Sequence, residues 1–240
     1  MATPATPVVE HDALCALGRE LQGLDVNGWR LAVPTCFHVS LAPPALVMSS
    51  VPGLSLSRWM ESGHRLPDAL FAAVPAAVLD ALLVLWSRGK QHGDLQLHNI
   101  MCDVEGKVIS FIDPDAESPV PSFGPLSRWH EVATGDLSYL LYDASVTVSG
   151  PAARRAPLRH QEFAKRVLTA AIGKIEGAES VRALVEAVDR GARQRVRTHV
   201  ALSWSLGLPW KLVLRWLASR RITRIISSLD MPGSRVQQAL

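Results

Sequence analysis

The segment from His92 to Asp115, HGDLQLHNIMCDVEGKVISFIDPD, constrains the fold of this chain more than any other. Residues 100–112 consist of two apolar runs around an Asp-Val-Glu-Gly turn sequence, a pattern that predicts a β-hairpin. Antiparallel pairing would bring Asn99, just before the first strand, beside Asp113, just after the second. Because Asp94 lies only five positions before Asn99, we expect two carboxylates and one amide to converge at one end of the hairpin.

These residue types suit phosphoryl transfer, which needs a carboxylate for the acceptor proton and oxygen ligands for magnesium on the nucleotide phosphates. Asp94 is the candidate base, and Asn99 and Asp113 are the candidate magnesium ligands. Asp115, two residues further on, is an additional candidate ligand. Single Asp and Asn residues beside a hairpin are more often turn or capping residues. Three of them at this spacing favour phosphoryl transfer.

The pattern HxDxxxxN with a downstream strand ending in Asp resembles the catalytic and metal-binding loops of the protein-kinase-like superfamily. The HGDL opening and the IDxD ending look most similar to aminoglycoside phosphotransferases and related small-molecule kinases. Pro114 and Asp115 depart from the DFG motif of protein kinases, which also favours a small-molecule kinase. The resemblance implies ATP and Mg²⁺ as cofactors, and transfer of the γ-phosphoryl group to a hydroxyl of a small molecule or glycan.

The same resemblance implies an α+β protein-kinase-like fold with a reduced small β lobe and a mainly helical large lobe. We expect residues 1–7 to be a disordered tail, 8–53 to form the reduced small lobe and hinge, and 54–240 to form the large lobe. The segment Val51-Pro52-Gly53 is similar to the hinge of small-molecule kinases, with an ordinary Pro-Gly turn as the alternative. The hinge assignment implies that Ser49, Ser50 and Val51 bind the nucleotide.

Three further residues are expected to support the site. His92 should pack and hydrogen-bond within its loop, without a role in proton transfer. Asp136, at the start of a predicted helix, matches the Asp that binds the catalytic-loop backbone in kinase-like enzymes. Glu20, or as a weaker candidate Glu10, matches the helix glutamate of the small lobe.

The parts of a kinase that grip phosphate are missing from the sequence. It contains neither GxGxxG nor GxxxxGK, and no lysine precedes Lys90, so Glu20 is expected to have no lysine partner. We expect fewer than five small-lobe strands, with the Glu20 helix packed against the central hairpin. Three explanations stay open: a pseudokinase acting as a binding or regulatory module, a truncated reading frame, or an enzyme that uses an arginine such as Arg19 or Arg30.

Hydrophobic periodicity and turn residues predict the other elements. They are a helix over 9–24 capped by Asp12, strands at 30–33 and 45–48, a helix over 67–88, a loop over 117–128, a helix from Asp136, a basic linker over 150–159, and two or three helices over 160–229.

Composition indicates a globular protein, since 48% of the 240 residues are hydrophobic and 20% are charged. Cys15, Cys36 and Cys102 are isolated, so the sequence supports neither a zinc site nor a disulfide framework, and a reducing compartment is expected. The first residues lack the features of a secretory signal. The apolar segments 66–86 and 201–218 contain too many charges or prolines to span a membrane. We expect a cytoplasmic location, with peripheral membrane binding as an alternative.

The C-terminal region is basic and free of acids. No Asp or Glu occurs between Gly191 and Leu229. This stretch contains Arg193, Arg195, Arg197, Lys211, Arg215, Arg220, Arg221 and Arg224, interleaved with Trp204, Trp210 and Trp216. For any single residue, a solvated or internally paired arginine and a core tryptophan are favoured. The cluster as a whole indicates an anionic partner such as a phosphorylated glycan or a membrane surface, and we do not expect nucleic acid.

Overall fold

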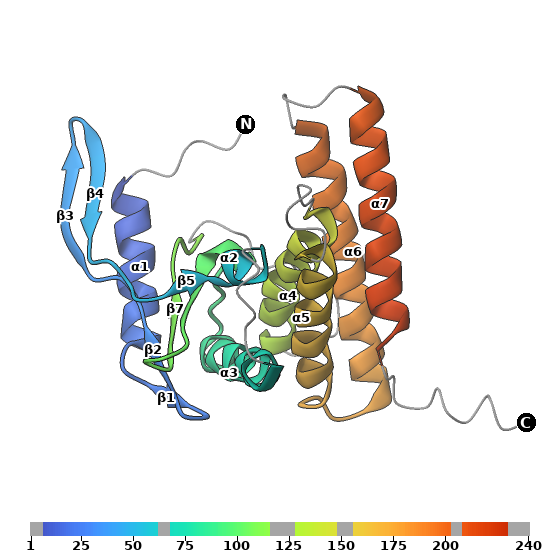
Figure 1. Cartoon of the computed structure of the whole chain (residues 1–240), viewed down its shortest axis with the longest axis horizontal. Coiled ribbons are helices and arrows are strands. Elements are labelled where there is room, and N and C mark those ends of the chain that lie inside the picture. Colours follow the sequence, from blue (N-terminus) through green and yellow to red (C-terminus); the bar gives the residue numbers. More distant parts are fainter. Residues whose placement is uncertain (1–6, 62–67, 116–127, 148–155, 203–207, 230–240) are drawn as a thin grey trace, which may run out of the picture.

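The computed structural model describes residues 7–61, 68–115, 128–147, 156–202 and 208–229. These residues form an α+β fold, the class expected from the sequence (Figure 1). The elements in chain order are α1 (Pro7–Leu21), β1 (Asp25–Val26), β2 (Trp29–Ala32), β3 (Cys36–Leu41), β4 (Pro44–Met48), β5 (Leu54–Ser55), α2 (Leu56–Glu61), α3 (Asp68–Ser87), the 3₁₀ turn η1 (Leu97–Asn99), β6 (Ile100–Asp103), β7 (Val108–Phe111), α4 (Arg128–Val146), α5 (Ala156–Ile172), α6 (Ala178–Leu202) and α7 (Leu208–Ser227).

The expected hairpin is present and forms the centre of a five-stranded mixed sheet with the order β1-β2-β7-β6-β5. β6 and β7 pair antiparallel, with Ile100 opposite Phe111. All four residues of β7 are buried, as its β-branched and aromatic composition requires. β2 pairs with β7 in parallel, with Leu31 opposite Ile109. The sheet therefore contains strands from both expected segments, 8–53 and 54–240.

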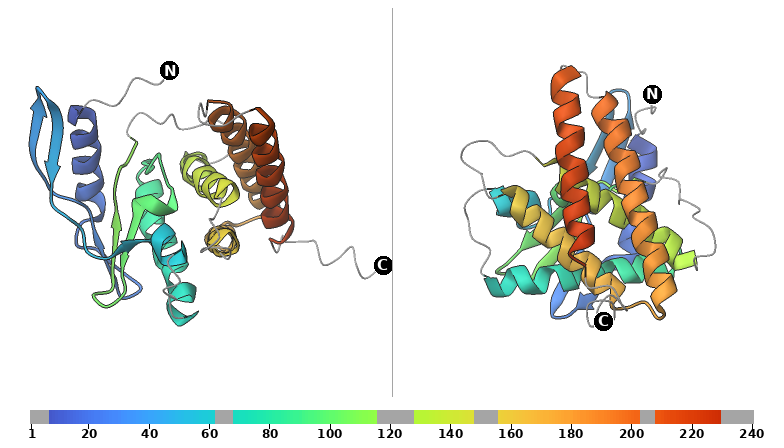
Figure 2. Two further views of the ribbon diagram at one scale, coloured as in Figure 1. Left: turned by 45° about the horizontal axis from the view of Figure 1, so that its top comes forward. Right: turned by 90° about the vertical axis from the view of Figure 1, so that its right-hand side faces the viewer.

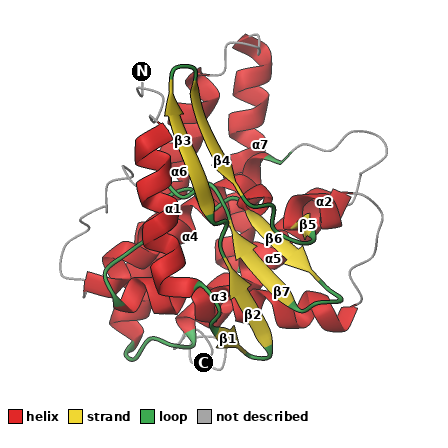
Figure 3. Cartoon of the chain, turned by 90° about the vertical axis from the view of Figure 1, so that its left-hand side faces the viewer, coloured by secondary structure: helices red, strands yellow, loops and turns green. Residues whose placement is uncertain are grey.

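A separate two-stranded sheet, β3–β4, lies beside α1 at one edge of the molecule (Figure 3). Leu14, Leu17 and Leu21 are buried on one side of α1, at the helical spacing seen in the sequence. The expectation that this helix packs against the central hairpin is corrected, because its main contacts are with β3, β4, β2 and α3. α1 also begins at Pro7, so Asp12 lies inside the helix and is not its N-cap.

Four strands precede residue 53 in the described chain, and two of them, the two-residue β1 and the longer β3, were not expected. The β3 sequence, CFHVSL, lacks a regular alternation of buried and exposed side chains, so it has no clear strand signal.

Helices make up the other half of the molecule, where α4 packs on α5, α6 and α7, and α6 and α7 lie side by side (Figure 2). α4 begins at Arg128, eight residues before the predicted start at Asp136. α5 begins at Ala156, inside the segment expected to be a linker. No helix in the described part of the chain is long and apolar enough to cross a membrane.

Candidate functional site

Helix α4 positions the loop between His92 and Asn99 through two carboxylates, the buried Asp136 and the partly buried Asp143. Asp136 accepts hydrogen bonds from the backbone N–H groups of His92 (3.0 Å) and Gly93 (2.9 Å). It also accepts one from the indole N–H of Trp86 at 2.8 Å. Burial raises the pKa of Asp136, and the nearby His92 imidazole and these N–H donors oppose the rise. The hydrogen bonds expected of Asp136 are therefore present, although this residue lies within α4 and not at its start.

The second carboxylate, Asp143, lies seven residues further along α4, which places it on the same face of the helix. It accepts a hydrogen bond from the Leu97 backbone N–H at 3.0 Å. Burial raises the pKa of Asp143 too, against the effect of that donor. One helix thus fixes both ends of the loop.

Gly93 lets the loop approach the chain that follows β7. Its φ is +85°, and a Cβ built at this position would lie 2.2 Å from the carbonyl oxygen of Asp115. The Asp115 N–H donates to the His92 carbonyl at 2.9 Å across the same contact. Only glycine satisfies both the backbone angle and the close approach. This contact places Asp113 and Asp115 beside the loop that contains Asp94.

The Asp94 carboxylate is held at both oxygens. Gln96 Nε2 donates to Oδ1 at 2.6 Å, and Asn99 Nδ2 donates to Oδ2 at 3.0 Å. Asn99 Nδ2 also donates to the Asp94 backbone carbonyl at 3.0 Å. The amide of Asn99 is buried, and no hydrogen-bond partner of its Oδ1 is found in the described structure. An oxygen in this state is a ready ligand for a cation.

Asp113 lies two residues after the end of β7, close to the position predicted from the sequence. The Ile112 N–H donates to the Asn99 carbonyl at 3.0 Å, so the pairing of the hairpin continues to the site. Asp113 has a φ of +51°, in the left-handed region that Asp tolerates better than most residues.

A cleft of about 300 Å³ opens at this place, with apolar side chains from α1 and β4 on one side. Its described lining consists of Val9, Glu10, Leu14, Leu46, Met48, Asp94, Gln96, Asp113, Pro114, Asp115 and Tyr139. Asp94, Asp113 and Asp115 thus share one cavity, while Asn99 lies buried behind Asp94 and is not part of this lining. The described lining contains four carboxylates and no Lys or Arg, which makes the cleft suited to cations.

His92 is fully buried, and its ring lies 5.8 Å from that of Phe111, tilted by 52°. Burial lowers the pKa of this imidazole, with Asp136 and then Asp94 acting in the opposite direction. A neutral, enclosed ring agrees with packing support for the loop.

The structure corrects one expectation about Glu20, which does have cationic partners. Its carboxylate forms ion pairs with Arg88 and Lys90, at the entrance to the His92 loop. Glu20 is not among the described residues that line the cleft, whereas Glu10, three turns earlier on α1, is.

The residues expected to form a hinge make contacts within the protein that were not expected. The Ser49 N–H donates to the Thr35 carbonyl at 2.8 Å, and the Ser49 hydroxyl accepts from the Thr35 N–H at 2.9 Å. The Ser49 amide is thus occupied within the protein. Ser49, Ser50 and Val51 are not among the described residues that line the cleft, which receives Leu46 and Met48 from the preceding strand.

Sequence reasoning missed three residues that belong to this site. Tyr139 lines the cleft from α4, and it follows Asp136 by three residues, so helical spacing could have indicated it. Asp143 could have been found by the same spacing. Arg195 of α6 places its guanidinium 3.3 Å from the centre of the Tyr139 ring, and its charge acts on Asp94 and Asp136. No local pattern marks Arg195, because only packing of α6 on α4 brings it there.

No protein-family model matches this chain, and no sequence among curated proteins is found to be similar to it.

Proposed function

We propose that this protein is an ATP-dependent phosphotransferase that moves the γ-phosphoryl group to a hydroxyl of a small molecule or glycan, within a protein-kinase-like fold. The observation that carries the proposal is the arrangement of Asp94, Asn99 and Asp113 around the end of one hairpin. Asp94 and Asp113 line the same cleft, and Asn99 holds the Asp94 carboxylate. This is the set of groups that the reaction needs, in one place.

The residues fit a magnesium ion. Asn99 Oδ1 is a buried acceptor for which the described structure provides no donor, and a cation held by Asn99 and Asp113 would satisfy it. Asp115 offers a further carboxylate in the same cleft. When bound, magnesium would neutralise charge on the nucleotide phosphates. The apolar wall formed by Leu14, Leu46 and Met48 offers a surface for the adenine ring.

Asp94 would act on the acceptor. Its carboxylate would take the proton of the acceptor hydroxyl as that oxygen formed a bond to the γ-phosphorus, and the bond from phosphorus to the bridging oxygen of ADP would break. The hydrogen bonds from Gln96 and Asn99 fix the carboxylate in the orientation for this role. Arg195, which lies near Asp94 without lining the cleft, would offset part of the surrounding negative charge.

Replacement of Asp94 tests this assignment. Asp94→Asn should lower acceptor-dependent ADP release by about 10²–10⁴-fold while nucleotide affinity stays nearly the same, because the change removes a proton acceptor and no phosphate contact. Release would be measured with purified full-length protein, Mg-ATP and a panel of aminoglycosides and other hydroxylated compounds. Asp103→Asn, at the opposite end of the hairpin, is the matched control. Turnover of Asp94→Asn within about twofold of the wild type would remove Asp94 from the mechanism.

A pseudokinase that binds nucleotide as a regulatory module is the second candidate. It is favoured by the absence of Lys and Arg from the described lining of the cleft, and by the engagement of Lys90 and Arg88 with Glu20. Magnesium-dependent nucleotide binding without phosphoryl transfer to any acceptor tested would favour this candidate.

We further propose an anionic membrane surface, on the cytoplasmic side, as the partner of the basic C-terminal region. Several of its arginines are engaged internally: Arg193 with Asp189, Arg215 with the Arg197 carbonyl, and Arg221 with the carbonyls of Ser145 and Thr147. Two of the three tryptophans in this region are not in the core, since Trp210 is 65% exposed and Trp216 is 56% exposed on α7, and Trp204 lies outside the described residues. Arg220 lies over the Trp216 ring, 4.7 Å from its centre. Exposed tryptophans beside arginines are typical of membrane-surface helices.

A further inference from the structure

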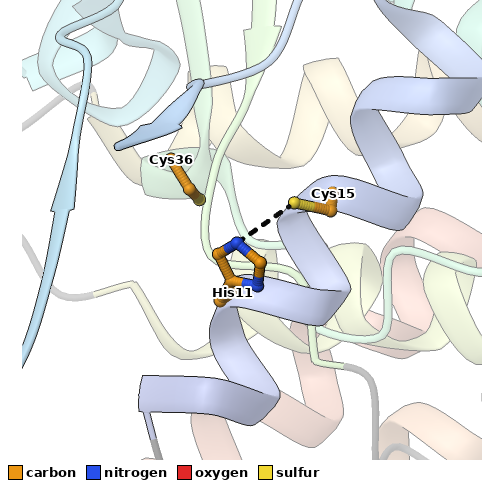
Figure 4. Close-up of side chains that lie close together, drawn as sticks. All are labelled: His11, Cys15 and Cys36. Carbon is orange, nitrogen blue, oxygen red and sulfur yellow. Dashed lines mark hydrogen bonds between the residues drawn. The ribbon is translucent and has the colours of Figure 1, made fainter. Parts of the chain in front are cut away.

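Three side chains that are scattered in the sequence meet between α1 and β3. The Cys15 and Cys36 thiols and a ring nitrogen of His11 all lie within 4.8 Å of one another. Figure 4 shows the side chains of His11 and Cys15 on α1, with Cys36 on the opposing strand pointing toward them. His11 and Cys15 are four positions apart on α1, so they lie on one face of the helix. The packing of α1 against β3 brings Cys36 to the same place.

The distances suit a tetrahedral metal site. Zinc–sulfur and zinc–nitrogen bonds of about 2.3 Å and 2.0 Å put the ligand atoms of such a site roughly 3.5–3.8 Å apart. His11 Nε2 and Cys15 Sγ are already 3.5 Å apart. Because Cys15 is exposed and Cys36 and His11 are partly exposed, small side-chain rotations can close the remaining separation.

The histidine has the support that a metal ligand needs. Its Nδ1 lies 3.0 Å from the Asp12 carboxylate, which leaves Nε2 directed at the thiols. A carboxylate behind the imidazole fixes the tautomer and raises the basicity of the ligating nitrogen, and this arrangement accompanies most histidine ligands of metals. A cysteine pair that only formed a disulfide would need neither His11 nor Asp12.

We propose that His11, Cys15 and Cys36 bind a zinc ion, which links α1 to the β3–β4 sheet and leaves one coordination position open. Two thiolates and one imidazole select a soft or borderline divalent ion, and zinc is the commonest that accepts them in tetrahedral geometry. Burial, followed by the neighbouring Cys15, raises the pKa of the Cys36 thiol, so metal binding would release protons as thiolates form. This inference does not depend on the proposed phosphotransferase activity.

The site also adjoins the cleft. Leu14 precedes Cys15 and lines the cleft from α1, and the strand that pairs with β3 contributes Leu46 and Met48. A metal that joins α1 to β3 would restrain two walls of the cleft relative to each other.

Metal titration of the full-length protein under reducing conditions tests the inference. We expect one zinc ion per chain by isothermal titration, and thiolate-to-cobalt charge-transfer absorption on addition of Co²⁺. His11→Asn, Cys15→Ser and Cys36→Ser should each weaken zinc binding by more than about 100-fold, and Asp12→Asn by roughly 10–100-fold. His38→Asn, on the same strand as Cys36, is the matched control and should bind zinc like the wild type.

Alkylation of the wild-type protein provides a readout that does not require the variants to fold. Zinc should protect Cys15 and Cys36 from alkylation, as measured by mass spectrometry of their peptides, with no effect on the buried Cys102. Zinc binding that survives Cys15→Ser and Cys36→Ser in folded variants would overturn the proposal. Alkylation of both thiols at the same rate with and without zinc would also overturn it.

Discussion

Among single residues, Gly93 is the position where the loop should tolerate substitution least. Gly93→Ala combines a φ of +85° with a clash against the Asp115 backbone, so we expect a loss of roughly 3 kcal/mol in the free energy of unfolding. Gly23→Ala is the matched control, since Gly23 also has a positive φ of +78° but nothing within 4 Å of the added carbon. That change should lose about 1–2 kcal/mol. If urea denaturation gave the same loss in the free energy of unfolding for both variants, Gly93 would not lie as close to the Asp115 backbone as described.

His160, on α5, is expected to make the stability of the protein depend on pH. Burial lowers the pKa of His160 to about 4, with Glu61 opposing the shift. The folded state therefore keeps the ring neutral while the unfolded chain takes up a proton below the ordinary pKa of about 6.5. Stability is fully present above that pH and is lost as pH falls from 6.5 to 4, by up to about 3 kcal/mol.

The free energy of unfolding, measured by urea denaturation across this range, checks the expectation. His92, whose pKa is also lowered by burial, contributes in the same direction. His160→Gln should therefore reduce the slope of the free energy against pH without removing it. A slope unchanged by His160→Gln would mean that this ring is not held neutral in the folded protein.

Among the elements, α4 positions residues of the candidate site, and α7 carries the exposed tryptophans proposed to bind a membrane surface. α4 supplies Asp136 and Asp143 to the loop and Tyr139 to the cleft, all from one helix. The periodicity of a helix could have predicted this common face once Asp136 was chosen. The start of α4 could not be predicted, because the residues from Arg128 onward follow a loop-like run rich in Pro and Ser.

The exposed tryptophans of α7 lead to a test on vesicles. The full-length protein should co-sediment with phosphatidylserine-containing vesicles and much less with phosphatidylcholine vesicles, because basic and aromatic side chains bind anionic interfaces. The double variant Trp210→Ala and Trp216→Ala should lose most of this binding. Leu158→Ala, which changes another large exposed apolar residue on α5, should keep it. Equal binding to both vesicle types would exclude an anionic surface as the partner.

In the whole molecule, local signals predicted the hairpin and the long apolar helix α3, while long-range contacts escaped prediction. Turn residues and β-branched runs are enough to predict β6 and β7, because the two strands of a hairpin are close in sequence. The parallel pairing of β2 with β7 joins segments more than seventy residues apart and has no local signature.

The same limit applies to the sites. Asp94, Asn99 and Asp113 could be identified because one hairpin holds them. The contact of Arg195 with Tyr139, the pairing of Glu20 with Lys90, and the meeting of Cys15 with Cys36 depend on packing between distant segments. The sequence pattern therefore predicted the residues at the end of the hairpin. The residues that pack around them could be identified only from the fold.

The proposed function requires that this cleft bind a nucleotide through magnesium. Isothermal titration with a non-hydrolysable ATP analogue, with and without Mg²⁺ in metal-free buffer, tests it most directly. We expect weak binding that requires Mg²⁺ and falls more than about tenfold in Asp113→Ala, because the described lining of the cleft offers no Lys or Arg to the phosphate charge. Asp103→Ala, at the far end of the hairpin, should bind like the wild type. Binding that is equally tight without Mg²⁺, or unchanged by Asp113→Ala, would contradict the proposal.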